Sequence, residues 1–300
     1  MRIFVTGASG HIGSAVVPEL LRAGHQVLGL ARSDSSAAAI KAIGAEVRRG
    51  DLKDLGVLAE AAAASDGVIH LAFESLASDM AESLDTDRRA IEAIGAALEG
   101  SGKPFVSTTA SLTLSFIGGI TDRPATEEDV LPGGPRVDGE NAVIALAERG
   151  VRSAVIRLPP LVHGVLDRHG LFPQLVGIAR TQGVSGYVAD GANRWPAVHT
   201  VDAARLYRLA VENAPAGSRL HAVAEDGVPF HKLAEVIAGK LDMATAGIAV
   251  GDAAAHFSHL APFVGLDNPI SSEQTRQMLA WKPTHPTLVE DIDQGFYFEN

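Results

Sequence analysis

The chain opens with an apolar run that ends in a glycine-rich turn, MRIFVTGASGHIG, and a helix-like pattern follows directly. In a strand–turn–helix of this kind, Gly7 permits a tight turn, Gly10 lets the backbone approach a pyrophosphate, and Gly13 allows close helix packing. Free N–H groups at the start of the helix attract the anion. The turn therefore predicts a dinucleotide site, and the alternative is a turn with a structural role alone. The expected contacts are Thr6, Gly7, Ser9, Gly10, His11, Ile12 and Gly13.

Short apolar runs then alternate with helix-like stretches up to Leu158. Helices are expected near residues 34–43, 53–64, 79–99 and 138–149. This rhythm is typical of βαβ units and predicts an α/β fold, a Rossmann-type doubly wound parallel sheet.

After Leu158 the alternation breaks, with a helix expected near 171–181 and a returning strand near 219–224. We predict an NAD(P)-binding Rossmann domain over residues 1–158, joined by that strand, and a mainly substrate-binding region over 159–300.

Composition excludes several classes of protein. The 300 residues are 46% hydrophobic, enough for a sizeable core, yet no apolar run has the length of a membrane span and no signal peptide pattern opens the chain. We expect a soluble, cytoplasmic protein. The absence of Cys rules out disulfides, thiolate metal sites and a Cys nucleophile.

Charge and histidine spacing bear on partners. The net charge of −11 and the scattered basic residues argue against nucleic acid. The histidines lack the spacing of a metal site, so we predict none. The expected partner is a small-molecule substrate, without membrane or nucleic acid, and a homodimer is the assembly considered.

The end of the second strand bears on which dinucleotide binds. An acid about 20 residues beyond the turn would hold the ribose hydroxyls of NAD, whereas an Arg would accept the phosphate of NADP. Arg32 lies 19 positions after Gly13, and Ser33 follows it. These two residues favour NADP, although the nearby Asp34 keeps NAD open. The alternative for Arg32 is a solvated surface charge.

Residues after the third and fourth strands are further candidates for cofactor contacts. Asp51 and Leu52 are expected to meet the adenine, and Leu71, Ala72 and Phe73 to line the middle of the cofactor. Alternatively, Asp51 is the N-cap of the helix over 53–64, and the three apolar residues are ordinary packing at a strand end.

Five segments resemble the extended short-chain dehydrogenase/reductases, also described as the NAD-dependent epimerase/dehydratase superfamily. They are TGASGHIG, GVIHLAF, RLPPLVHG, VHTVDAARLYRLAVE and SSEQTRQMLAWKP. The resemblance covers nearly the whole chain. It implies a Rossmann domain with a smaller, interleaved C-terminal substrate-binding region.

The resemblance also implies an active site, which this chain fills only in part. Active members combine a Ser or Thr after the fifth strand with a Tyr-x-x-x-Lys helix. Thr109 fits the first role, with Thr108 and Ser111 as nearby substitutes, but the best match to the helix places Arg136 at the Tyr position and Glu140 at the Lys position. The chain thus resembles the atypical short-chain dehydrogenases, which lack the usual pair.

Arg136 and Glu140 have two interpretations. They form either an exposed i,i+4 ion pair or a site in which Arg136 clamps an anionic or carbonyl substrate while Glu140 orients it or touches the ribose. Because a permanently charged Arg cannot donate a proton, another acid is needed. His163 is the candidate, since its ordinary pKa of about 6.5 suits proton transfer. The alternative is a loop histidine that only forms hydrogen bonds.

The remaining candidates follow from the resemblance. Arg194, Trp195 and His199 correspond to substrate-pocket residues, with packing and capping as the alternative. Pro159 contacts the cofactor or only shapes its loop, and Asp202 reads best as an N-cap or first-turn acid.

The predicted function is an NADP-preferring, atypical short-chain dehydrogenase that acts on a small carbonyl or alcohol substrate, with Thr109, His163 and Arg136 as catalytic candidates. Two alternatives stay open. One is a sugar-nucleotide epimerase or dehydratase with bound NAD, and the other is a non-catalytic NADP-binding sensor.

Overall fold

A computed structural model describes residues 1–73 and 79–299 of the chain. Its centre is a sheet of seven parallel strands in the order β10-β6-β5-β4-β1-β2-β3. The Rossmann-type doubly wound sheet predicted from the sequence is confirmed, and the expected returning strand is β10, at its edge beside β6. The strands are β1 (Arg2–Thr6), β2 (Gln26–Ala31), β3 (Glu46–Arg49), β4 (Gly67–His70), β5 (Pro104–Ala110), β6 (Arg152–Leu158) and β10 (Ser218–His221).

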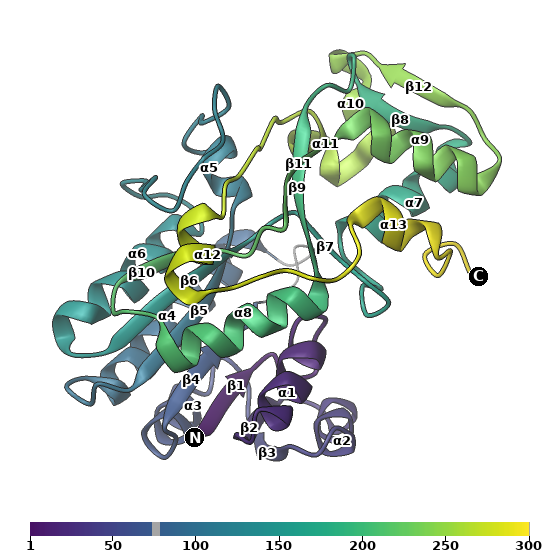
Figure 1. The fold of residues 1–300 in the computed structure, drawn as a ribbon. Helices are drawn as coiled ribbons and strands as arrows, with labels where there is room; N and C mark the ends of the chain where they lie inside the picture. The colour runs from purple at the N-terminus through teal and green to yellow at the C-terminus, as the bar shows by residue number, and fades with distance from the viewer. Residues whose placement is uncertain (74–78, 300) are drawn as a thin grey trace.

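Helices cover both faces of this sheet (Figure 1). Side chains alternate between the faces, so Val5 packs into one hydrophobic cluster while its neighbour Phe4 packs into the other. The Val5 face is covered by α1 (Gly13–Arg22), α2 (Asp34–Ala42) and α8 (Thr200–Asn213). The Phe4 face is covered by α3 (Leu55–Ala63), α4 (Met80–Leu98) and α6 (Val137–Ala145), with a 3-10 turn at Leu146–Arg149.

A second lobe forms most of the C-terminal half (Figure 1). A three-stranded sheet joins β7 (Leu161–His163), β9 (Arg194–His199) and β11 (Glu225–Pro229), and a two-stranded sheet joins β8 (Ser185–Val188) and β12 (Thr245–Ile248). These strands share a separate core with the fully buried Trp195 and Phe172. The helices of this lobe are α7 (Leu171–Gln182), α9 (Phe230–Leu241), α10 (Ala253–Phe257), α11 (Ala261–Val264) and α13 (Leu288–Asp293).

The two lobes are interleaved in sequence. After β9 the chain returns to the large sheet as α8 and, later, as β10 and α12 (Glu273–Leu279). The short α5 (Leu112–Phe116) follows β5, and 3-10 turns occur at Val250–Asp252 and Ser258–Leu260. Because the chain passes between the lobes several times, residues of the second lobe reach the carboxyl ends of the parallel strands.

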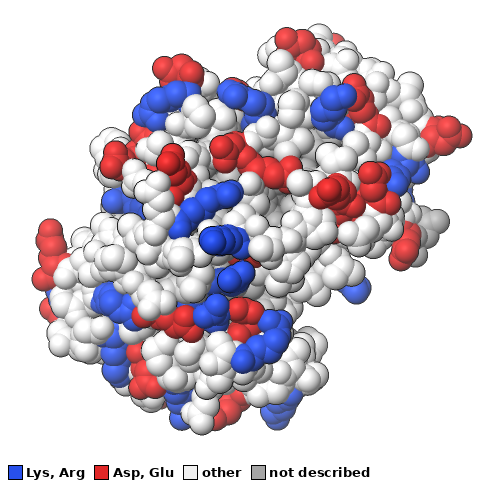
Figure 2. All heavy atoms as spheres, viewed as in Figure 1, with Lys and Arg blue, Asp and Glu red and all other residues white. Residues whose placement is uncertain are grey.

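Acidic and basic side chains are mixed over the surface shown in Figure 2. Among the helices of the described residues, none is long and apolar enough to cross a membrane.

Candidate cofactor and substrate site

A cleft of about 400 Å³ lies at the carboxyl ends of the first four strands. The order of the strands reverses between β1 and β4, which is where open α/β sheets bind ligands. The predicted glycine turn supplies one wall of the cleft. Its lining residues are Gly7, Ser9, Gly10, His11, Ile12, Gly13, Leu30, Arg32, Ser36, Gly50, Asp51, Leu52, Leu71, Ala72 and Phe73.

The three glycines of the turn differ in what surrounds them. Gly7 has a φ of 68°, and a Cβ there would lie 2.8 Å from the Ala72 nitrogen. A Cβ on Gly13 would lie 2.1 Å from the Gly7 oxygen, so this position is closed by packing within the protein. At Gly10 the nearest atom to a Cβ would be 3.3 Å away, although Gly10 lines the cleft. The missing side chain of Gly10 thus leaves room in the cleft, as the close approach of a pyrophosphate requires.

The start of α1 also fits an anion. Its N-cap, Ile12, makes no side-chain capping bond, and the first turn of the helix contains no acid. Uncapped N–H groups and the positive end of the helix dipole both favour a phosphate at this position. The residues present therefore fit a dinucleotide.

The adenosine end of the cleft contains Arg32, Ser36 and Asp51. Sequence reasoning missed Ser36, whose hydroxyl also takes part in a capping box with Ser33 at the start of α2. Ser33 itself is the N-cap and is not among the lining residues. Asp34 is not among the lining residues either; its side chain is fully exposed and pairs with Arg49 at 2.9 Å.

The structure bears on the alternative roles of Asp51 and of the apolar residues that follow the fourth strand. The N-cap of α3 is Asp54, so the interpretation of Asp51 as that cap is wrong. Leu71 and Ala72 line the cleft and also pack against the two core clusters, so lining and packing are not exclusive. Thr6 lies behind them, fully buried, where its hydroxyl accepts hydrogen bonds from the Leu71 and Ala72 N–H groups.

Arg136 lies at the end of the cleft formed by Phe73. Its guanidinium stacks 3.9 Å from the centre of the Phe73 ring, and its Nη2 donates to the Thr108 carbonyl at 3.2 Å. Nη1 is buried without a hydrogen-bond partner among the described residues and lies 3.9 Å from the Asp87 carboxylate. Burial lowers the pKa of Arg136, and Asp87 opposes that shift.

Glu140, four residues later, faces elsewhere. Its carboxylate accepts hydrogen bonds from Arg157 at 2.5 and 3.0 Å and from Arg219 at 2.7 Å. Burial favours a raised pKa for Glu140, but these two guanidinium groups outweigh it and hold the pKa below its ordinary value. The exposed Arg136–Glu140 ion pair is therefore wrong. The expectation that Glu140 touches the ribose also needs correction, because the buried Arg157 and the partly buried Arg219 occupy its oxygens.

The hydroxyl groups around the end of β5 have different surroundings. Thr109 is buried, and its Oγ1 has no hydrogen-bond partner within residues 1–73 and 79–299. Thr108 points to the other face of the sheet, where its hydroxyl lies 2.7 Å from that of Tyr207. Ser111 is fully buried beneath Asn268. Of the three hydroxyl groups considered for this strand end, Thr109 alone is left without a partner.

Comparison with known proteins agrees with this geometry. Residues 3–95 match the model of the NAD dependent epimerase/dehydratase family. An uncharacterized protein of Schizosaccharomyces pombe is 45% identical over 298 residues, which span 99% of this chain and 100% of that protein. The chain belongs to the NAD-dependent epimerase/dehydratase family.

Two further relatives of this family member have assigned names. A 2-alkyl-3-oxoalkanoate reductase of Stenotrophomonas maltophilia is 30% identical over 224 residues, which span 71% of this chain and 66% of that protein. A crystal structure of DesIV, a dTDP-glucose 4,6-dehydratase of Streptomyces venezuelae with NAD and TYD bound, has a TM-score of 0.76 at 20% identity, with 99% of this chain and 96% of that chain covered. The second likeness shows the fold alone.

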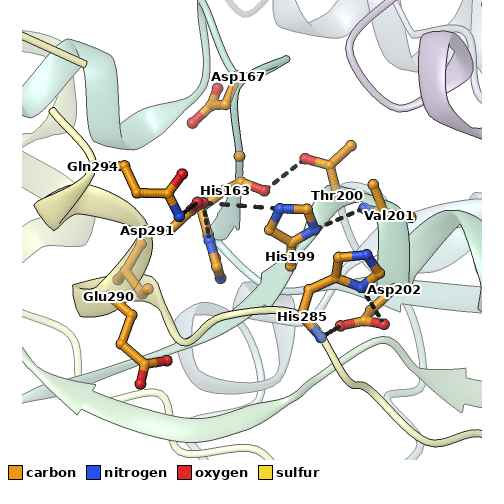
Figure 3. Close-up of polar contacts among 12 residues, drawn as sticks. His163, Asp167, His199, Thr200, Val201, Asp202, His285, Glu290, Asp291 and Gln294 are labelled. Carbon is orange, nitrogen blue, oxygen red and sulfur yellow. Dashed lines mark hydrogen bonds and ion pairs between the residues drawn. The ribbon is translucent and has the colours of Figure 1, made fainter. Parts of the chain in front are cut away.

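In this epimerase/dehydratase family member, His163 lies in a cluster at the lobe junction (Figure 3). It belongs to strand β7 rather than to a loop, and its Nδ1 donates to Asp291 of α13 at 2.7 Å. Its Nε2 is buried without a partner. The same Asp291 oxygen lies 4.0 Å from Nε2 of His199, whose ring stacks on that of His285 at 4.6 Å.

His163 thus has the arrangement of a carboxylate-held imidazole with one free nitrogen. None of the hydrogen bonds or ion pairs found in the described residues joins it to Thr109 or Arg136, and it is not among the residues that line the cleft. Its assignment as the catalytic acid stays a prediction.

The glycine turn contacts this cluster through His11. Nε2 of His11 donates to the Thr200 hydroxyl at 2.9 Å, and that hydroxyl donates to the His163 carbonyl. Nδ1 of His11 faces Asp167 at 3.7 Å. Burial raises the pKa of Asp167 to about 7, and burial lowers the pKa of His11 to about 4. Between these two pKa values, at mildly acidic pH, Asp167 is protonated and His11 is unprotonated, so both side chains are neutral.

The remaining candidates of the family resemblance lie outside the cleft. Arg194 pairs with Asp267 at 2.7 Å, whereas Trp195 is fully buried in the second core, which corrects its placement in a substrate pocket.

His199 is the N-cap of α8, so Asp202 is a first-turn acid and not the cap. The Asp202 carboxylate accepts from the Thr284 and His285 N–H groups. Pro159 is buried between β6 and β7.

Proposed function

We propose that this protein is an NADP(H)-dependent oxidoreductase that reduces a ketone or oxidises the corresponding alcohol. The observation that carries the proposal is the cleft, which is lined both by the glycine turn and by the adenosine-end pair of Arg32 and Ser36. Gly10 leaves room for a pyrophosphate, and the uncapped start of α1 supplies donors to it.

The choice of NADP rests on charge at the adenosine end. A guanidinium and a hydroxyl suit a ribose phosphate, and an acid in that place would repel it. The acid nearest in sequence, Asp34, is fully exposed and paired with Arg49, so it leaves this position to Arg32.

The reaction type is supported by the relative named 2-alkyl-3-oxoalkanoate reductase, which reduces an oxo group according to its name. A bound NADP(H) supplies or accepts the hydride. In this proposal the Thr109 hydroxyl meets the substrate oxygen, which is supported by a buried Oγ1 that has no partner among the described residues. The proton then comes from a group other than Arg136, whose guanidinium stays charged.

Cofactor titration and turnover together test the proposal. Calorimetric titration of the purified protein should give tighter binding of NADPH than of NADH, and ketones should then oxidise NADPH, as followed by absorbance. NAD that stays bound through purification would instead favour a sugar-nucleotide epimerase or dehydratase. Tight NADPH binding without turnover of any carbonyl would favour a sensor.

A further inference from the structure

Arg136 occupies an unusual backbone position for its residue type. It is the N-cap of α6 with φ 67° and ψ −30°, in the left-handed region that a side chain with a Cβ disfavours. A glycine there would avoid this cost. Strained, partly buried residues of this kind occur where the side chain is needed at a site.

The guanidinium is also short of partners. It has five N–H donors, but among the residues that the structure describes it makes one hydrogen bond, to the Thr108 carbonyl. Nη1 is buried and has none. Buried donors without acceptors are costly, so the geometry calls for an acceptor beyond those that residues 1–73 and 79–299 provide.

The charge balance around Arg136 indicates what that acceptor is. Among the residues that the structure describes, the carboxylate paired with Arg136 is that of Asp87, which lies 3.9 Å away, beyond hydrogen-bond distance, and its other oxygen accepts from His70 at 3.1 Å. Within that part of the chain the cation is therefore incompletely neutralised. A neutral carbonyl would leave that charge in place, whereas a dianionic phosphate would meet repulsion from Asp87. A single carboxylate neutralises the cation and meets less repulsion from Asp87 than a dianion does. Its two oxygens also match the paired N–H donors of the guanidinium.

The position is close to the proposed chemistry. Phe73 both lines the cleft and stacks on the guanidinium, and the carbonyl that accepts from Arg136 belongs to the residue before Thr109. We infer that Arg136 binds a carboxylate of the substrate, so that the substrate class is an oxo acid. This inference rests on the proposed oxidoreductase function and adds a specificity residue to it.

The test compares an acid with its uncharged counterpart. The substrates are 3-oxohexanoate and methyl 3-oxohexanoate, each with NADPH, and the proteins are the wild type, Arg136→Gln, Arg136→Lys and the control Arg149→Gln. Arg149 pairs with Glu99 on the surface, so its loss should leave both substrates unaffected. Calorimetry of 3-hydroxyhexanoate with the NADP-loaded proteins gives a measurement of binding without turnover.

We expect the wild type to favour the acid over the ester in kcat/KM by about ten- to a hundredfold, the range for hydrogen bonds to a charged group. Arg136→Gln should remove that preference through KM and abolish 3-hydroxyhexanoate binding, with ester reduction retained. Arg136→Lys should keep part of the preference. Thermal unfolding of Arg136→Gln should not fall below that of the wild type, because a buried cation that is short of acceptors is removed.

The outcomes separate this inference from the proposed function. Equal use of acid and ester by the wild type, or an unchanged preference in Arg136→Gln, would overturn the carboxylate site and leave the oxidoreductase intact. Stronger displacement of 3-hydroxyhexanoate by inorganic phosphate than by acetate would also overturn it. If neither substrate is reduced while 3-hydroxyhexanoate binds only when Arg136 is present, the site stands and the proposed function fails.

Discussion

Glu140 and Arg157 form a buried ion pair in which one carboxylate accepts two hydrogen bonds from one guanidinium, at 2.5 and 3.0 Å. Both side chains are almost completely buried, with exposures of 3% and 1%. Arg157 also donates to the Asp129 carbonyl, and Arg219 approaches Glu140 from β10. The pair thus joins α6 to two strands of the large sheet.

Glu140→Gln should destabilise the protein by about 3–5 kcal/mol, since it leaves the buried Arg157 and the partly buried Arg219 without their anion. Denaturant unfolding measures this change. The matched variant Glu148→Gln, next to the exposed Arg149 in the 3-10 turn that follows α6, should have little effect. An equal loss in both variants would mean that the buried pair does not contribute.

The same pair changes what is expected from restoring a Tyr-x-x-x-Lys helix. Glu140→Lys would place a third cation beside Arg157 and Arg219, so the double variant Arg136→Tyr, Glu140→Lys should fail to fold rather than gain activity. Circular dichroism checks this. A folded double variant that reduces generic ketones would contradict the expectation.

Gly10→Val should abolish NADPH binding with little loss of fold. A Cβ at this position meets only the Gly7 oxygen, at 3.3 Å, whereas the branched methyl groups would enter the space left for the pyrophosphate. Calorimetry and thermal unfolding measure the two effects. Gly13→Ala provides the contrast, because its Cβ would lie 2.1 Å from the Gly7 oxygen and should disrupt the fold itself. Undiminished binding by Gly10→Val would show that the turn is only structural.

Arg32→Ala should weaken NADPH binding by about tenfold or more, the value of a charge-assisted hydrogen bond, and leave NADH binding nearly unchanged. Titration of NADPH and NADH against the wild type and Arg32→Ala measures this change in affinity. Arg48→Ala is the control, since Arg48 pairs with Glu60 on the surface. Equal affinities of the wild type for the two cofactors would refute the NADP preference.

The pair of Asp167 and His11 should give two opposing pH dependences of stability. The native pKa of Asp167 is about 7, against an ordinary value of 3.8. Between these two pH values the native state holds a proton that the unfolded state has lost, so the stability contributed by Asp167 falls as pH rises. The native pKa of His11 is about 4 against 6.5, so the unfolded state holds the extra proton and stability rises with pH across that window.

In the wild type these two contributions offset each other between about pH 4 and 6.5. Asp167→Asn should therefore reveal a stability that rises with pH over this range, and His11→Gln should reveal one that falls up to about pH 7. Unfolding temperatures measured across the range check both. Parallel curves for the three proteins would show that the two groups do not titrate as described.

The parts of the molecule that the sequence predicted are those encoded locally. The glycine turn, Arg32 and Asp51 each follow a parallel strand, and such strand ends meet at one edge of the sheet. Partners distant in sequence could not be predicted. Asp291 lies 128 residues after His163, and Arg219 lies 79 residues after Glu140. Only the fold brings these pairs together, and no spacing pattern in the sequence indicates them.

The order in which the chain is made gives the edge strand β10 a further importance. Synthesis finishes β6 well before β10, and the segment between them holds β7, α7, β8 and β9 of the second lobe. Until β10 emerges, the nascent sheet has an open edge that can pair with other chains. Part of the second lobe must therefore be translated before the first can close, and a recombination that exchanged residues 159–300 as one block would separate the large sheet from its own last strand.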